Sequence, residues 1–363
     1  MLTLTDGTVY ISAERLSADT FLEKADRILI VKDVQNGILY DVLKRSAEVK
    51  EISFDEPLTD FVPDLILALG KDKAIERAKR LANEKDLPLS IVPTSFCLSP
   101  FIPFYFDVDT PIYPNRAFNC FLIDSLLENA GRVSLAEGVA VIFALSLSLF
   151  DQSYQDGLFQ REELSQNKLS IIDSVLDDTL AIDMPNHKTY LAIKKILPAI
   201  LTALDEREDD LSFKLSLLLK NKRNKGYESD LFSCCYTIFS AYLNYKPFDN
   251  LFLPVDRVKV LENAQTDYKT GLENAIMQDV DDFSRRNYLT RSFLEKAYPI
   301  LKKFESLSAV YRRLYGSDGY FLKREVDPDI LLSLLPTLAE SSLGYGLLKN
   351  VYYNSFLDPF IKF

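Results

Sequence analysis

The sequence predicts an α/β plus all-α protein, with a parallel-sheet domain over residues 1–131 and a helical domain over residues 132–363. Short apolar runs alternate with amphipathic stretches in the first third, which favours a mostly parallel sheet with helices on its faces. Beyond about residue 132, apolar residues recur at helical spacing almost throughout. A chain of 363 residues also exceeds the usual size of one compact domain.

The N-terminal part contains a series of short segments with strand character. Each is bounded by polar, glycine or proline residues, as strands commonly are. The expected strands are Thr8 to Ser12, Arg27 to Lys32, Glu48 to Ser53, Leu65 to Leu69, Leu89 to Val92 and Ala117 to Ile123, with a further regular segment at Gly37 to Arg45. One amphipathic helix is expected over residues 73–85, because its alanine, isoleucine and leucine residues repeat at helical spacing.

The stretch from Leu65 to Thr94 lays out a strand, a turn with a single glycine, a helix and a second strand. In such a unit the turn after the first strand aims helix N-terminal amides at a bound phosphate, and glycines let the backbone approach the anion. Here the turn contains Gly70 followed by Lys71, Asp72 and Lys73. The architecture therefore indicates nucleotide binding, whereas the turn residues depart from a glycine-rich phosphate loop.

Composition narrows the classes of partner. The net charge of −11 argues against general nucleic-acid binding and against attraction to anionic membranes, so we expect small molecules or proteins as partners. The uncharged apolar run from Gly138 to Phe150 is too short to span a bilayer and predicts a buried helix. No secretory signal is visible, and four cysteines without framework spacing are expected to be reduced, which favours a cytoplasmic protein.

The pattern LGxxxAIxxAKxLAxxxxLPxxxVPTS, followed by a helical part, resembles the superfamily of glycerol dehydrogenase, glycerol-1-phosphate dehydrogenase, iron-containing alcohol dehydrogenase and dehydroquinate synthase. The match covers about residues 27–151. The residues that carry it are Gly70, Ala74, Ile75, Ala78, Lys79, Ala82, Pro88, Val92 to Ser95, Asp124, Gly138 and Asp151. The resemblance implies a dehydroquinate-synthase-like fold with a cleft between its domains, an NAD(P) cofactor, a zinc or iron ion, and a homodimer or larger assembly.

The resemblance assigns the family's cofactor-binding positions to individual residues of this sequence. The family's GGGS turn corresponds to Gly70 to Lys73, so a carboxylate at Asp72 adds like-charge repulsion to a phosphate site, which the two lysines could offset. Asp33 matches a position that meets the adenosine ribose, although an aspartate at a strand end is also a common turn or cap residue. The candidate cofactor residues are Gly70, Lys71, Lys73, Thr94, Ser95 and Asp33.

The metal positions depart further from the family. Val141 stands where the resemblance places a metal-binding aspartate, and Asp230 and Cys234 stand at two histidine positions of a second motif. The chain has a single histidine, His187, which we interpret as an exposed or capping residue. Zinc or iron is therefore not expected, and the remaining candidates for an altered site are Glu137, Asp230 and Cys234. Glu137 could instead supply a favourable charge at a helix N-terminus.

Three functions remain open at the level of the sequence. The first is a degenerate family member that acts as a binding or regulatory protein. The second is an NAD(P)-dependent oxidoreductase of a polyol or polyol phosphate with an atypical or absent metal. The third is a non-redox binder or enzyme that uses the cleft between the domains, with apolar contacts from the loop Phe96 to Phe106 and anion contacts from Lys71 or Lys73.

Overall fold

The computed structural model describes most of the N-terminal half and the principal helices. The described residues are 1–4, 7–13, 24–33, 47–58, 60–101, 104–107, 110–114, 118–182, 187–204, 227–245 and 283–315, with positions 211, 215, 219, 334, 338, 347 and 348. The predicted segment from Gly37 to Arg45 lies outside the described residues.

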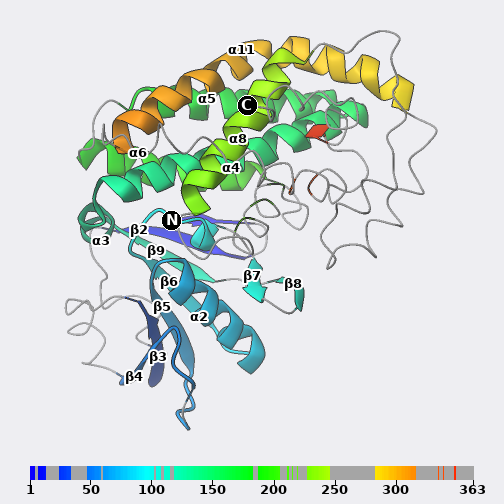
Figure 1. Ribbon diagram of the computed structural model, residues 1–363. Helices are drawn as coiled ribbons and strands as arrows, with labels where there is room; N and C mark the ends of the chain where they lie inside the picture. The colour runs from blue at the N-terminus through cyan, green and yellow to red at the C-terminus, as the bar shows by residue number, and fades with distance from the viewer. Residues whose placement is uncertain are drawn as a thin grey trace. The chain divides into compact units, whose positions relative to one another are not determined.

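A seven-stranded sheet forms the centre of the N-terminal part (Figure 1). Its order is β1-β2-β9-β6-β5-β3-β4, and every pairing is parallel except that of the short edge strand β1 with β2. The strands are β1 (Leu2–Thr3), β2 (Val9–Ala13), β3 (Arg27–Lys32), β4 (Glu48–Ser53), β5 (Leu65–Gly70), β6 (Leu89–Pro93) and β9 (Asn119–Ile123). This confirms the predicted mostly parallel sheet. A separate antiparallel pair joins β7 (Phe104–Asp107) and β8 (Thr110–Pro114).

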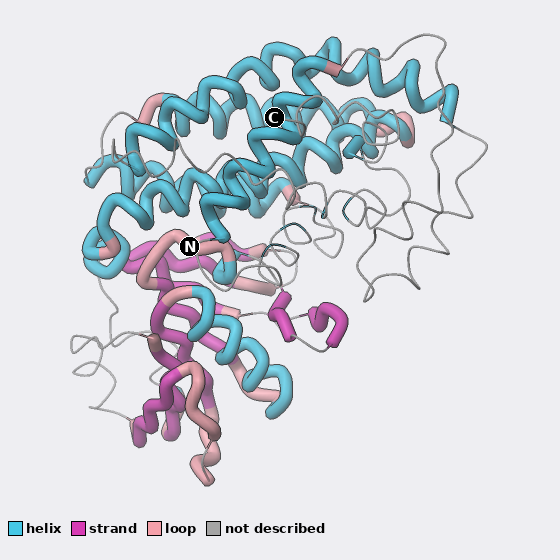
Figure 2. Tube along the Cα trace, viewed as in Figure 1, coloured by secondary structure: helices cyan, strands magenta, loops and turns pink. Residues whose placement is uncertain are grey.

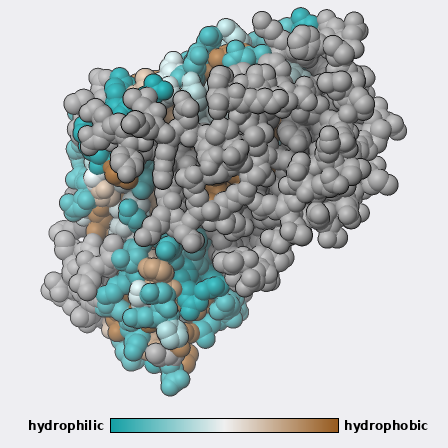
Figure 3. Space-filling model, in the orientation of Figure 1, coloured by the Kyte–Doolittle hydropathy of each residue, from teal (hydrophilic) through white to brown (hydrophobic). Residues whose placement is uncertain are grey.

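Burial explains why these residues form strands. All six residues of β5 are buried, as are all five of β6, which fits the continuous apolar runs of interior parallel strands. Helix α2 (Asp72–Lys85) contacts β5, and its buried residues include Ala74, Ile75 and Ala78. The described surface of the N-terminal part is largely hydrophilic (Figure 3). The helix predicted over residues 73–85 is therefore confirmed.

The remaining described helices are α3 (Asp124–Asn129), α4 (Gly131–Leu158), α5 (Glu162–Leu180), α6 (His187–Ala203), α8 (Tyr227–Asn244) and α11 (Phe283–Tyr315). The chain divides into two compact units, one with residues 1–141 and 184–202, and one with residues 142–183 and 203–363. Within the described residues of the second unit, all regular structure is helical (Figure 2). The domain boundary after residue 131 stays a prediction.

Aromatic side chains build the core of the second unit. The Phe143 ring lies 5.0 Å from Phe232, 5.1 Å from Phe239 and 5.3 Å from Phe304 between centroids. Helix α4 is long and apolar enough to cross a membrane, but 89% of its most apolar window is buried inside the structure, which is typical of a core helix. The run from Gly138 to Phe150 is entirely buried, as predicted. All four cysteines are buried and none of them forms a disulfide bond, which agrees with the predicted reduced thiols.

Candidate functional site

The turn between β5 and α2 lies at the carboxyl edge of the sheet, where ligands bind in open α/β folds. Gly70 ends β5 with a φ of +149°, a conformation that residues with a side chain rarely adopt. The Thr94 amide, which follows β6, donates a hydrogen bond of 3.0 Å to the Gly70 carbonyl. Three of the predicted cofactor residues, Gly70, Lys71 and Thr94, are therefore brought together.

Asp33 joins them from the neighbouring strand. It follows β3, which pairs with β5 in parallel, and its Oδ2 accepts a hydrogen bond of 2.8 Å from the Lys71 backbone amide. A Cβ atom built on Gly70 would lie only 2.0 Å from Asp33 Oδ1. The carboxylate therefore fills the space directly beside the turn. Burial raises the pKa of Asp33, while the hydrogen bond from the Lys71 amide and the charge of Lys71 act in the opposite direction.

The first turn of α2 is tied to the loop after β6. Asp72 Oδ1 accepts a hydrogen bond of 3.0 Å from the Ser99 amide, and the Ser99 hydroxyl donates to Glu76 Oε1 at 2.8 Å. The Lys73 ammonium lies 5.2 Å from the centroid of the Phe54 ring. Asp72 thus serves to hold the loop, and the Lys73 side chain is placed over an aromatic ring.

Lys79 is a residue that the sequence reasoning treated only as part of a motif. It is fully buried, and its ammonium donates a hydrogen bond of 2.7 Å to the Ser99 carbonyl and lies 5.0 Å from the Phe118 ring centroid. A lysine four residues after Ile75, on the apolar face of an amphipathic helix, is the sequence signal that could have revealed this role. Lys79 fixes the loop that carries Ser99 to α2.

Glu137 approaches the same turn from α4. Its side chain is 12% exposed, and its Oε1 lies 4.0 Å from the Lys71 ammonium. Burial raises the pKa of Glu137, and the Lys71 charge opposes this. The Ser95 hydroxyl lies close to the carboxyl group but makes no hydrogen bond of normal geometry. Because α4 begins at Gly131, Glu137 lies beyond its first turn, and the interpretation of this residue as an N-terminal charge is wrong.

Several buried oxygens around this turn have no hydrogen-bond partner among the described residues. They are Asp33 Oδ1, Thr94 Oγ1, Ser95 Oγ and Glu137 Oε2. Buried polar atoms in native proteins are nearly always paired, so a group of unpaired acceptors in one place marks a region where a ligand or water completes the structure. The turn at Gly70 is therefore the best candidate binding region in the first unit.

The position expected for a metal-binding aspartate is apolar. Val141 is fully buried, and Cys234 on α8 is also fully buried. The side chain of Asp230 lies outside the described residues, and Glu137 belongs to a different unit from Asp230 and Cys234, so a site shared by these three stays a prediction. Among the residues that the structure describes, no group of three His, Cys, Asp or Glu residues could hold a metal ion.

His187 is the first residue of α6 and contacts the Glu128 carboxylate at the surface, where 61% of its side chain is exposed. The expectation of an exposed histidine at a helix start is confirmed. Near Asp230 and Cys234, the Phe232 ring of α8 stacks on Phe143 of α4 and on Tyr311 of α11, the latter with centroids 3.8 Å apart. This part of the helical unit is filled by aromatic packing.

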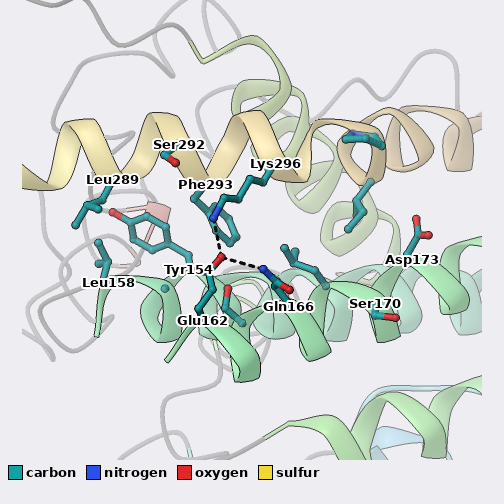
Figure 4. Close-up of a pocket in the computed structure, with 15 residues that line it drawn as sticks. Tyr154, Leu158, Glu162, Gln166, Ser170, Asp173, Leu289, Ser292, Phe293 and Lys296 are labelled. Carbon is teal, nitrogen blue, oxygen red and sulfur yellow. Dashed lines mark hydrogen bonds and ion pairs between the residues drawn. The ribbon is translucent and has the colours of Figure 1, made fainter. Parts of the chain in front are cut away.

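A separate cavity of about 640 Å³ lies among α4, α5 and α11 (Figure 4). Glu162 crosses it by accepting hydrogen bonds from Lys296 at 2.6 Å and from Gln166 at 3.1 Å, and these groups pull the pKa of Glu162 below its ordinary value. No described side chain lining this cavity has a buried polar atom without a partner. Glu162 and Lys296 already satisfy each other's charge in this cavity, so it is a weaker candidate than the turn at Gly70.

No family model and no curated protein matches the sequence. Solved structures match its fold. The iron-containing alcohol dehydrogenase from Corynebacterium glutamicum is similar with a TM-score of 0.59 and 11% identity over 99% of this chain and 95% of that chain. The iron-containing alcohol dehydrogenase from Thermococcus thioreducens is similar with a TM-score of 0.55 and 12% identity over the whole of both chains. At identities this low the likeness establishes the fold, and it confirms the predicted dehydroquinate-synthase-like arrangement.

Neither group that this fold implies fits the residues present. A divalent metal would need ligands where Val141 offers only a buried isopropyl group. A pyrophosphate at the Lys71 amide would meet the carboxylate of Asp33, which already accepts that hydrogen bond and fills the space beside Gly70. The chain shares the fold of these dehydrogenases, and the residues at the two positions that the resemblance implies are Val141 and Gly70 to Lys73.

Proposed function

We propose that this chain is a member of the glycerol and alcohol dehydrogenase-like superfamily that no longer oxidises alcohols and acts as a binding or regulatory protein. The observation that carries the proposal is Val141, which is fully buried at the position that the resemblance assigns to a metal-binding aspartate. Metal-dependent alcohol oxidation needs a cation that polarises the hydroxyl oxygen. A valine cannot hold that cation.

The aromatic contacts around α8 support the same conclusion. Phe143, Phe232 and Tyr311 form a continuous stack, and aromatic pairs in such contact add to the stability that burial gives. A hydrated cation beside these rings would have to be desolvated without compensating ligands. Aromatic packing on α8 beside Cys234, a position that the resemblance assigns to a histidine, supports a chain without this metal chemistry.

A small polar ligand is a second candidate, because Thr94 Oγ1 and Glu137 Oε2 lie buried without a partner near the turn. Such a ligand would offer N–H or O–H donors to these acceptors, with the Lys71 ammonium close by. A thermal-shift screen of small polar compounds checks this, with Thr94→Val and Glu137→Met as variants that remove the acceptors. Equal stabilisation of wild type and both variants by the same compound would exclude this site.

The main proposal is tested by elemental analysis of the purified protein together with melting temperatures in NAD, NADP and zinc. We expect no stoichiometric zinc or iron and a melting temperature that none of the three changes. Stoichiometric metal with stabilisation by a nicotinamide nucleotide contradicts the proposal. Cys234→Ser is the matched control for zinc bound through a thiolate, since Cys234 is the described buried candidate on α8.

A further inference from the structure

The hydrogen bond between Asp33 and Lys71 has the geometry of anion binding at a helix N-terminus. The first amides of an α-helix lack intrahelical partners, and the helix dipole favours negative charge there. Lys71 is the N-cap residue of α2, and it has no side-chain cap. The anionic group on its amide is the carboxylate of Asp33, with Oδ2 at 2.8 Å. The chain therefore supplies its own anion to this position.

The sheet register explains why Asp33 reaches the turn. Lys32 of β3 is paired with Leu69 of β5, so the next residue on each strand, Asp33 and Gly70, also lie side by side. The Asp33 amide donates to the Leu69 carbonyl at 3.4 Å, which continues the ladder by one step. Only glycine at position 70 leaves room, because a Cβ there would lie 2.0 Å from Asp33 Oδ1 and 2.5 Å from its Cγ. Asp33 and Gly70 form a matched pair.

The charged groups around the Lys71 amide would favour a bound anion if the Asp33 carboxylate were removed. Asp72 is held by the Ser99 amide. The Lys71 ammonium is about half exposed and lies 4.0 Å from Glu137, so its side chain can turn towards a second anion. The amide of Lys71 would then lack its acceptor, and an exogenous oxyanion would restore it.

We propose that Asp33 is a built-in occupant of an anion site at the Lys71 amide, and that it excludes phosphate-bearing ligands by holding this site itself. The inference rests on the proposed loss of dehydrogenase function, because the Asp33 carboxylate fills the space beside the turn that would receive a dinucleotide's pyrophosphate. The Lys71 amide at the start of α2 remains able to bind an anion, so removal of the Asp33 side chain allows inorganic pyrophosphate to bind there.

The test is calorimetric titration of inorganic pyrophosphate into wild type, Asp33→Ala and Asp33→Asn, each first shown to fold by its thermal transition. Wild type should bind weakly or not at all, and Asp33→Ala should bind at least about tenfold more tightly. Asp33→Asn should gain less, because the amide keeps the volume and an acceptor oxygen for Lys71. Asp33→Ser replaces the alanine variant if that one does not fold.

Asp64→Ala is the matched control, since Asp64 also accepts a hydrogen bond from a backbone amide, that of Arg27 at 3.0 Å, at a different place in the sheet. Pyrophosphate binding should not improve in this variant. An equal gain in Asp64→Ala, an equal gain in Asp33→Asn, or no gain in folded Asp33→Ala would each overturn the inference. In selectively ¹⁵N-lysine-labelled protein, pyrophosphate should shift the Lys71 amide resonance of Asp33→Ala, and a Lys71 resonance that stays unchanged would also overturn it.

The two proposals fail separately. Stoichiometric metal or alcohol oxidation by wild type would contradict the proposed function and leave the pyrophosphate titration of Asp33→Ala unaffected. A flat pyrophosphate titration of Asp33→Ala would contradict the occupied anion site and leave the metal analysis unaffected.

Discussion

The turn at Gly70 and the aromatic core around Phe143 differ in how their space is filled. At Phe143 the neighbouring helices contribute rings whose centroids lie 5.0 to 5.3 Å away, and the implied metal position nearby in the sequence holds the buried Val141. At Gly70 the polar character remains, and one carboxylate fills the space beside the backbone amide. Apolar and aromatic side chains fill the first region, and a charged side chain fills the second.

This difference predicts how far each change can be reversed. Aromatic packing involves many contacts, so no single substitution can turn it into a metal site, and each large truncation leaves a cavity. The carboxylate of Asp33 depends on one side chain and one glycine, so a single substitution changes the site. The helical unit should therefore respond to substitutions in its stability, and the turn should respond in what it binds.

The largest effect is expected for Phe143→Ala. Because this ring is fully buried against three others, its removal should lower the free energy of unfolding by about 3–5 kcal/mol. Equilibrium denaturation measures the change. Phe159→Ala is the control, because that ring is 51% exposed and its loss should cost less than about 0.5 kcal/mol. Comparable losses in the two variants would contradict the assignment of Phe143 to the core.

A smaller loss is expected for Gly70→Ala, which combines the unfavourable φ of +149° with the 2.0 Å approach to Asp33. The free energy of unfolding should fall by roughly 2–3 kcal/mol. In an Asp33→Gly background the cost of the same substitution should shrink, because only the backbone strain remains. Denaturation of the four proteins of this double-mutant cycle gives the coupling. A coupling of zero would show that Asp33 does not fill the space beside Gly70.

Much of this comparison could be predicted from the sequence, because it depends on local patterns. The buried run of β5 and the amphipathic α2 were both predicted. The hydrogen bond from the Lys71 amide to Asp33 could not be predicted from the sequence. It depends on the register between β3 and β5, whose paired residues are 37 positions apart along the chain. The burial of Glu137 was also missed, because the start of α4 at Gly131 carries no clear capping signal.

The smallest effect is expected for Glu137→Gln. Burial holds the pKa of this carboxyl above its ordinary 4.5, so the folded state binds the proton more tightly than the unfolded state does. Above that pKa the Glu137 carboxyl is charged, and this charged form destabilises the folded state. Burial is the largest cause, the attraction of Lys71 opposes it, and the repulsion of Asp72 adds to it. The substitution should stabilise the protein by up to about 1 kcal/mol at neutral pH.

The pH dependence gives the sign of this effect. The stabilisation by Glu137→Gln should shrink as the pH falls towards the raised pKa, because the wild-type carboxyl then becomes protonated and neutral. Melting temperatures of both proteins between neutral and mildly acidic pH measure this. Glu84→Gln is the control at an exposed carboxyl, whose side chain is 53% exposed, and its effect should be small at every pH. A gain that grows on acidification would contradict the burial of Glu137.

The central claim, that packing and an internal carboxylate have replaced the two implied ligands, is tested most directly by a crystal structure grown with zinc and NAD, with anomalous data at the zinc edge. We predict no zinc peak beside Val141 and the Asp33 carboxylate within hydrogen-bond distance of the Lys71 amide. A zinc peak held by side chains near Val141, together with the NAD pyrophosphate on the Gly70 turn, would contradict the claim.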